Sequence, residues 1–470
     1  MRPAVEAEKL GIPGLVITTT GFTELARLAG KASGFQGLRI SEYPGPVGIH
    51  TPEEIRENVA KVLFDQIIAG LTGSPQVGKV TASSTVWKPR AIVFSGTFEQ
   101  VHDFFDGQGW TDGLPVVPPT MARVEEFLKH SGYAPDEEIA ILPRANLKAV
   151  AWNIAANAVM AGCRPEHMPL IVAAVEALGD EKFNLGNIGS TSGLVPYLLF
   201  NGPIVRQLGI EYGGQLICKG PNPAIGRAIG LIVKNIAGYR PGKGYMGTFG
   251  YPLVFAVAED EGASPWEPFH VEHGFDAKAS TVTVGIANSW GPALAPNSTP
   301  DKGGAQITLE MLCRELPKKA RLVLFPERGP EAKNVMITIM LSSAVAKTLA
   351  GSGYSKQDVK QYVCDNARMS LREFDWAAKY GSYALHRSVR EHAEAGVYSE
   401  EFLGNPDDMV RILSGPEIVH IVVCGDPNRN RVMTLEGGQA QPVTREISLP
   451  ANWGALLEKS RGPHPRKSTG

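Results

Sequence analysis

The sequence of 470 residues contains few cysteines and no long hydrophobic run. No two cysteines form a CxxC pair, so their spacing favours neither a disulfide framework nor a zinc ribbon, and reduced thiols in a cytoplasm fit best. Because no stretch of about 18 apolar residues occurs, we expect no membrane insertion. The cysteines are Cys163, Cys218, Cys313, Cys364 and Cys424.

An excess of charge of one sign is also missing. Lysine and arginine number 46 against 48 aspartates and glutamates, which gives a net charge of −2. Proteins that hold phosphate backbones usually carry a positive field, so we expect no nucleic-acid partner. With 43% hydrophobic and 20% charged residues, the composition is that of a globular protein. We expect a small-molecule substrate and a homo-oligomer.

The first 72 residues predict a small, incomplete parallel α/β module. Short apolar, β-branched runs alternate with segments of helical periodicity. The clearest helix is the last, where Thr51, Pro52 and Glu54 form a capping-box pattern. The expected helices and strands are, in order, residues 5–10, 14–20, 22–34, 38–43 and 51–73.

The rest of the chain predicts a linker over residues 73–95 and one large α/β or α+β domain over residues 96–470. We expect helices at residues 95–107, 120–132, 146–162, 165–178, 225–238, 307–316 and 355–371. Strands are expected at residues 196–202, 253–259, 280–286, 320–326 and 417–425. A hairpin is expected at residues 433–450, and no fixed-period repeat indicates a solenoid.

The segment NAVMAGCRPEHMP, residues 157–169, holds the first candidate for chemistry. A glycine and a proline break the helix there, which places Cys163 near a helix N-terminus with Arg164 beside it and His167 one turn away. A helix N-terminus and nearby cations lower the pKa of a thiol, and the thiolate is the nucleophile. Alternatively, Cys163 is a small apolar residue at a helix corner, and Glu166 serves the helix dipole.

The segment GQGWTDGLPVVPPT, residues 107–120, is too rich in glycine and proline for regular secondary structure. Rigid irregular segments often hold functional side chains, which makes Trp110 and Asp112 candidates. Alternatively, Trp110 fills a gap in the core and Asp112 closes a turn through its own backbone.

The segment CKGPNPAIGRAIGLIV, residues 218–233, predicts a helix entered from a turn that contains glycine and proline. Such a turn exposes backbone N–H groups near Asn222, and Arg227 would clamp a carboxylate or phosphate. The segment has neither the Walker nor the GxGxxG pattern, and an ordinary loop-to-helix turn is the alternative.

Polar side chains also follow several expected strands. Asn201 follows one strand and Cys424 another, and since ligands collect at the carboxyl ends of strands in open sheets, both loops are expected to line one pocket. Carboxylates and imidazoles gather in the loop 258–275, and together such groups bind a divalent metal or transfer protons. A solvated loop is the alternative. The loop residues are Glu259, Asp260, Glu261, Glu267, His270, Glu272 and His273.

Several of these segments resemble a known family. GIPGLVITTTGFTELARLAGKASG resembles the second part of the UGSC-type domain, named for a Sec-Gly-Ser-Cys redox motif. Five later segments resemble the longer domain found with it in bacterial proteins: GWTDGLPVVPPT, NAVMAGCRPEHMP, NGPIVRQLGI, AIGRAIGLI and ASPWEPFHVEHGF. The resemblance implies redox chemistry through that motif. A fainter similarity to selenoprotein subunits of the glycine reductase type implies the same.

The sequence departs from this family at two places. The thiol or selenol motif would stand just before residues 5–17, where only Met-Arg-Pro-Ala is found, and no cysteine precedes Cys163. We therefore expect a shortened start, a redox partner subunit that supplies the motif, or a member that works without it. His273 stands where the family often has arginine.

Together these features predict a two-domain cytoplasmic enzyme acting on a small anionic molecule, either a thiol-dependent oxidoreductase or an enzyme that cleaves a carbon–heteroatom bond. Cys163 would be the nucleophile or redox thiol and His167 its proton partner. Arg164 and Arg227 would contact the anion. The other candidates are Asp112, Glu267 and His270 for acid–base or metal chemistry, and Trp110, Asn201 and Asn222 for substrate contacts. The alternatives are a metal-dependent hydrolase or lyase using residues 259–273, and a non-catalytic subunit of a redox complex. The sequence identifies no cofactor.

Overall fold

The computed structural model describes most of the chain, in segments separated by gaps. The described residues are 2–32, 35, 37–73, 90–189, 191, 193–242, 244–250, 253–291, 293–319, 336–380, 388–437 and 441–461. Most of the expected linker at residues 73–95 and the expected strand at residues 320–326 lie outside them. Mixed α/β structure is found, as the sequence predicts.

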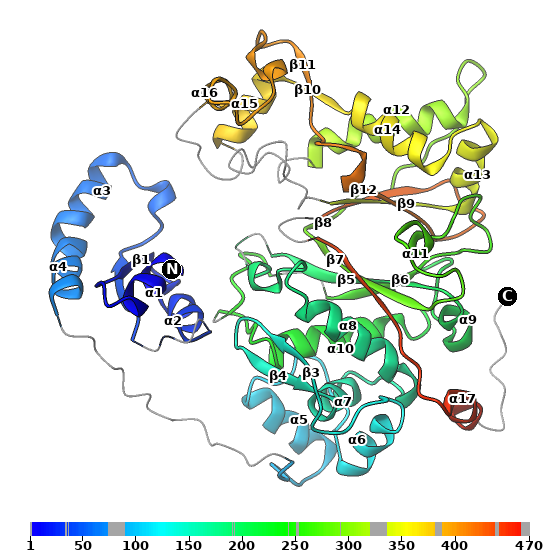
Figure 1. Ribbon diagram of the computed structural model, residues 1–470, viewed down its shortest axis with the longest axis horizontal. Helices are drawn as coiled ribbons and strands as arrows, with labels where there is room; N and C mark the ends of the chain where they lie inside the picture. The colour runs from blue at the N-terminus through cyan, green and yellow to red at the C-terminus, as the bar shows by residue number, and fades with distance from the viewer. Residues whose placement is uncertain are drawn as a thin grey trace.

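The N-terminal module, drawn in blue in Figure 1, contains two strands and helices that pack on them. Strand β1 pairs in parallel with β2, and Thr51 forms the expected capping box with Glu54. The apolar run at residues 14–20 favours a buried strand, but β1 is only partly buried, because its sheet has two strands and leaves Ile17 53% exposed. The elements are α1 (Arg2–Lys9), β1 (Leu15–Thr19), α2 (Thr23–Ala32), β2 (Arg39–Tyr43), α3 (Pro52–Asn58) and α4 (Phe64–Thr72).

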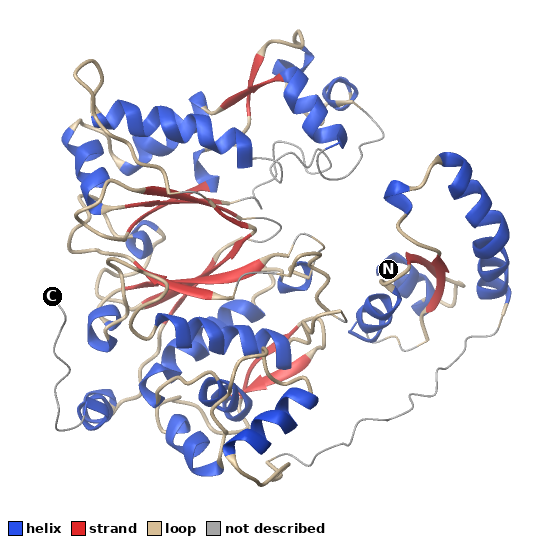
Figure 2. Ribbon diagram, turned by 180° about the vertical axis from the view of Figure 1, so that it is seen from behind, coloured by secondary structure: helices blue, strands red, loops and turns tan. Residues whose placement is uncertain are grey.

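From residue 90 onward the chain builds two four-stranded sheets, stacked between layers of helices (Figure 2). The first sheet has the order β14 (Val443–Glu446), β7 (Thr281–Ala287), β5 (Val195–Asn201) and β6 (Phe255–Ala258). Helices α8 (Met168–Gly179) and α10 (Asn222–Asn235) cover its outer face (Figure 1). Every residue of β5, β6 and β7 is buried, as is typical of strands covered on both faces.

The second sheet repeats this arrangement on the other side of the stack (Figure 1). Its order is β12 (Val419–Val423), β9 (Ile337–Leu341), β13 (Val432–Glu436) and β8 (Ser289–Trp290). The helices on its outer face are α12 (Gly304–Lys319), α13 (Ser343–Gly351) and α14 (Lys356–Asn366).

Alternating side chains explain how the two sheets pack face to face. Met340 and Val422 join the hydrophobic core of the first sheet, whereas their neighbours Ile339 and Ile421 join the core beneath α12, α13 and α14. Since successive residues of a strand point to opposite faces, the second sheet presents one face to the first sheet and the other to its helices. The result is a four-layer helix–sheet–sheet–helix sandwich.

The two sheets are built from equivalent units that exchange an edge strand. In each sheet a parallel pair, β5 with β6 or β9 with β12, is followed by an antiparallel strand, β7 or β13. The chain then crosses over: β8, which follows β7, pairs with β13, and β14, which follows β13, pairs with β7. Each unit therefore completes the sheet of the other.

The exchange corrects one expectation. The hairpin expected at residues 433–450 is wrong, because β13 and β14 belong to different sheets. Turn-forming residues between two short strands do not distinguish a hairpin from a crossover.

A further correction concerns the helix expected at residues 146–162. Its beginning is strand β4 (Leu147–Val150), which pairs with β3 (Glu138–Leu142) before α7 (Ala151–Met160) starts. The remaining elements are α5 (Phe98–Gly107), α6 (Met121–Leu128), α9 (Ile204–Leu208), α11 (Phe269–Glu272), β10 (Arg368–Ser370), α15 (Leu371–Tyr380), α16 (Val389–Glu394), β11 (Met409–Arg411) and α17 (Trp453–Arg461).

One buried hydrogen bond joins equivalent strands across the stack. The hydroxyls of Tyr197 in β5 and Thr338 in β9 lie 2.7 Å apart. Tyr197→Phe leaves the Thr338 hydroxyl buried without this partner, so we expect a loss of about 1–3 kcal/mol in the free energy of unfolding. Urea unfolding followed by circular dichroism measures it.

The double variant Tyr197→Phe with Thr338→Val is the matched control. It removes both polar partners, so most of the lost stability should return. A double variant that is destabilised by the full sum of its single changes contradicts this coupling.

Candidate active site

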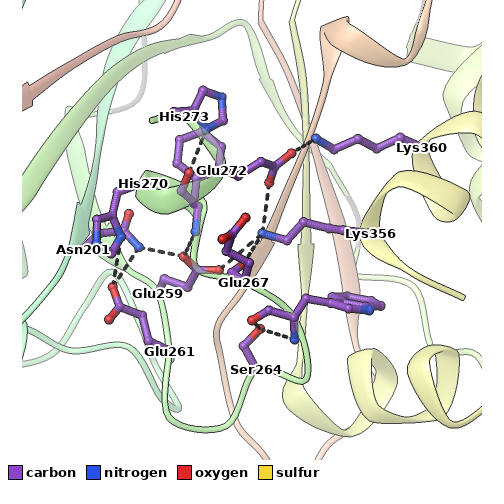
Figure 3. A network of polar contacts seen from close by, with 12 residues as sticks. Asn201, Glu259, Glu261, Ser264, Glu267, His270, Glu272, His273, Lys356 and Lys360 are labelled. Atoms are coloured by element: carbon purple, nitrogen blue, oxygen red, sulfur yellow. Dashed lines mark hydrogen bonds and ion pairs between the residues drawn. The ribbon is translucent and has the colours of Figure 1, made fainter. Parts of the chain in front are cut away.

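The carboxyl ends of parallel strands from both sheets meet at one end of the sandwich. Asp260, just after β6, donates its backbone N–H to the carbonyl of Val423 at the end of β12 over 2.8 Å. Gly425 donates in the same way to Tyr212 over 2.7 Å. The carboxyl ends of β5 and β12, where Asn201 and Cys424 stand, therefore lie at the same end of the sandwich, as expected from the sequence. A polar network occupies this region (Figure 3).

Glu259 lies at the centre of the network and is only 2% exposed. Its Oε2 accepts hydrogen bonds from the Asn201 amide over 2.6 Å and from the Phe269 backbone N–H over 2.7 Å. Its Oε1 lies 4.0 Å from the Lys356 ammonium and has no hydrogen-bond partner among the described residues. One carboxylate oxygen is thus fixed, and the other is left free for further interactions.

Burial sets the protonation behaviour of Glu259. Removal from water raises the pKa of this carboxyl, and the charge of Lys356 together with hydrogen bonds from Phe269 and Asn201 offsets the rise only in part. A carboxyl whose pKa is shifted upward by burial holds its proton closer to neutral pH, which is the property required of a general acid.

Two lysines of α14 connect the second unit to this network. Lys356 donates to the carbonyl of Glu267 over 2.8 Å and to the carboxylate of Glu272 over 3.1 Å, and Lys360 also pairs with Glu272 (Figure 3). Burial opposes the ionisation of Glu272, but these two lysines outweigh it and lower its pKa. The ion pairs tie α11 to α14, and so hold the two units together at the site.

His270 brings an imidazole next to the carboxylates. It is fully buried, and its Nδ1 lies 3.5 Å from Glu261, yet neither ring nitrogen has a hydrogen-bond partner in the described chain. The side-chain oxygens of Asn201 and Thr281, which pair across β5 and β7, are likewise buried and unpartnered. Since buried polar atoms are usually hydrogen-bonded, this concentration of atoms without partners among the described residues makes the region the candidate functional site.

Aromatic rings form one wall of the network. Phe269 stacks on His273 with ring centroids 4.1 Å apart, and His420 of β12 meets both rings edge to face. Burial lowers the pKa of His273 and lowers that of His420 well below its usual value. Both imidazoles are therefore neutral at neutral pH, which spares the site two charges beside the lysines.

Sequence reasoning found part of this site. Asn201 and His270 lie in it, as do the loop residues Glu259, Glu261, Glu272 and His273. The Glu267 side chain is exposed, and only its carbonyl takes part. Lys356, Lys360 and His420 escaped notice because a lysine on a polar helix and a histidine in an apolar strand give no signal of their own. The one indication in the sequence is that Lys356 and Lys360 are four residues apart, which places them on one face of a helix.

The metal site that the sequence offers as an alternative at residues 259–273 can be compared with the arrangement of the side chains there. Within the described ranges, no group of three or more histidine, cysteine, aspartate or glutamate side chains is arranged to hold a metal ion. The carboxylates are instead engaged by Asn201, by backbone N–H groups and by lysines.

A second cluster gathers other residues that the sequence singles out. Arg227 on α10 makes two hydrogen bonds of 2.8 Å to Asp112, which also accepts from the backbone of Leu114. The guanidinium expected to clamp a substrate anion is therefore occupied by a carboxylate of the chain itself. Asp112 both closes a turn and fixes Arg227.

Cys163 lies beside this pair, but not as an activated thiol. Its Sγ donates to the carbonyl of Ala224 over 3.2 Å. Burial raises the pKa of the thiol, and the nearby charge of Arg227 offsets this only partly. The expected lowering of the pKa is wrong, because desolvation outweighs the charge of Arg227.

The remaining expected residues have structural contacts. His167 is buried and its Nδ1 accepts the backbone N–H of Arg164 over 3.2 Å. Arg164 is exposed and lies 3.6 Å from the carboxylate of Glu166, which is buried. The fully buried Asn222 amide bonds to backbone atoms of residues 211, 216 and 256, and so fastens the loop before α10. Trp110 packs edge-on against Phe105, with ring centroids 5.2 Å apart.

Comparison with known proteins identifies the first part of the chain. Residues 1–73 match the model of the UGSC family, which confirms the resemblance seen in the N-terminal module. No curated protein and no solved structure matches the chain. Along the described residues, no helix is long and apolar enough to cross a membrane.

Thiol labelling tests the state of the cysteines. Cys218 is exposed, whereas burial raises the pKa of both Cys163 and Cys424. Because the thiolate is the reactive form, iodoacetamide at neutral pH should modify Cys218 and spare the other two. Peptide mapping by mass spectrometry measures this. Rapid labelling of Cys163 in the folded chain contradicts the arrangement described here.

The raised pKa of Glu259 predicts an effect on stability. Above 4.5, the usual pKa of the group, the folded state retains a proton that the unfolded state has lost, so this group lowers stability as the pH rises through the folded-state pKa. Glutamine carries no charge, so Glu259→Gln should be the more stable protein at high pH, by about 1.4 kcal/mol for each unit of the pKa rise. The difference should shrink toward pH 4.5.

Urea unfolding of both proteins between pH 4.5 and 8 measures this difference. Glu267→Gln is the matched control, because that side chain is exposed. A difference between Glu259→Gln and wild type that does not vary with pH contradicts the raised pKa.

Proposed function

We propose that this chain is an enzyme that cleaves a carbon–heteroatom bond of a small polar molecule by acid–base catalysis, with Glu259 as the proton donor. The observation that carries the proposal is the buried Glu259 carboxyl, one oxygen of which has no hydrogen-bond partner among the described residues, in the same network as the buried His270 imidazole, which also has none there. A buried carboxyl with a raised pKa, just after the end of a strand, is a usual component of a catalytic site.

In this proposal the two groups act on opposite sides of the bond. His270 takes a proton from a substrate carbon, and the electron pair of that C–H bond forms a double bond. The bond from the neighbouring carbon to the heteroatom breaks, and Glu259 gives its proton to the leaving heteroatom. The two protons balance, and no external oxidant or reductant is needed.

The surrounding residues support these roles. Asn201 and the Phe269 N–H hold Glu259 in one orientation, which a general acid requires. Lys356 stabilises the carboxylate left after the proton is transferred, since its ammonium is 4.0 Å away. The network reaches the surface at Glu261 and Glu272, whose side chains are 27% and 25% exposed.

A thiol-dependent reaction has less support. The Cys163 thiol is hydrogen-bonded to a backbone carbonyl and its pKa is raised, so it lacks the features of a nucleophile. The expected redox partner subunit, homo-oligomer and cytoplasmic location remain predictions from the sequence.

Proton exchange tests the proposal before the substrate is known. Wild-type chain is incubated in D₂O with a panel of small hydroxy, amino and thio acids, and ¹H NMR follows loss of C–H signals and release of the heteroatom group. For any compound that reacts, Glu259→Gln should slow elimination by about 10²–10⁴-fold, while Cys163→Ser should retain the wild-type rate.

Glu267→Gln serves again as the control for a change of charge nearby. Elimination at an unchanged rate in Glu259→Gln contradicts the proposal. Loss of activity in Cys163→Ser, with Glu259→Gln unaffected, would instead favour the thiol reaction.

A further inference from the structure

One face of α10 fixes the irregular segment around Trp110. Arg227 holds Asp112 and the carbonyl of Leu114, Lys234 binds the carbonyl of Thr111, and Asn235 donates to the carbonyl of Trp110 over 2.9 Å. Residues 227, 234 and 235 are spaced by seven and eight, so they share a face of the helix. These contacts fix the backbone of the segment, and the rings of Phe104 and Phe105 pack edge-on against the Trp110 indole, which is the preorganisation that ligand sites need.

The fixed indole lines a cavity between α7 and α10. Its volume is about 350 Å³, at the lower end of the range for small-molecule sites. The apolar part of the wall is formed by Trp110, Leu147, Met160 and Ile236. A flat ring and aliphatic side chains suit an apolar body of modest size, because they bury it without requiring hydrogen bonds.

The charges at this cavity are mostly positive. Lys148 and Arg240 line it, and no described carboxylate forms an ion pair with Arg240. Lys148 pairs with Glu138 at the surface. Lys234 lies near Arg240 and also near the carboxylates of Asp112 and Asp106. Arg227 is already neutralised by Asp112. Arg240 is therefore the cation left to meet a ligand.

We propose that this cavity is a second ligand site, which binds a small carboxylate with an aromatic or aliphatic body. The body packs on Trp110, and the carboxylate pairs with the guanidinium of Arg240. Both groups are planar, so they can form two parallel hydrogen bonds. The site is distinct from the Glu259 network, and its occupation does not depend on the reaction proposed there.

Two probes of the same size and different charge test this inference. Binding of 4-fluorobenzoate and 4-fluorobenzamide to the full chain is measured by ¹⁹F NMR line broadening and confirmed by calorimetry. We expect the benzoate to bind at least about tenfold more tightly than the amide. Arg240→Gln should remove most of that preference, and Trp110→Leu should weaken both probes.

Arg429→Gln is the matched control, since Arg429 is an exposed arginine away from this cavity. It should leave both affinities unchanged. Equal affinity of wild type for the two probes, absence of benzoate binding at millimolar concentration, or equal effects of Arg240→Gln and Arg429→Gln would each overturn the proposal. The comparison of probes uses wild-type protein, so it stands even where the Trp110 variant fails to fold.

Discussion

The exchange of edge strands between the two sheets is the constraint on which the rest of the large unit depends. β14 is the last strand along the described chain, yet it completes the first sheet, and β8 from the first unit completes the second. Neither sheet has four strands without the other unit. The exchange therefore ties the two sheets together through shared strands, so neither unit has its complete sheet alone.

This arrangement explains why a charged network lies between the units. Removing carboxylates and ammonium groups from water costs several kcal/mol for each ion unless partners replace the solvent. The first unit supplies Glu259 and Glu272, and the second supplies Lys356 and Lys360, so each unit brings charges that the other neutralises. The pairing is incomplete at Glu259 and His270. Stability sacrificed at such places is a common mark of an active site.

Much of the local structure could be predicted from the sequence, because it follows from local physical chemistry. The capping box at Thr51 and the apolar strands around β5 and β12 are examples. The sandwich could not be predicted, because its strand exchange depends on pairings between residues about 150 positions apart, such as Val284 with Val443. Similarly, the pKa of Cys163 depends on burial by α10, which a motif of thirteen residues does not reveal. Asn201 and His270 were found because strand ends and clustered imidazoles carry a signal, whereas Lys356 became visible only through its partners.

The most direct measurement is a titration of the Glu259 carboxyl itself. Chain labelled with ¹³C at the glutamate carboxyl carbon is followed by NMR between pH 3 and 9, and the Glu259→Gln variant assigns the signal. We expect a midpoint above 4.5, the usual value, and a further rise when Lys356 is replaced by methionine, because a cation that favours the carboxylate is lost. A midpoint at or below 4.5 would contradict the role of Glu259 as a buried proton donor.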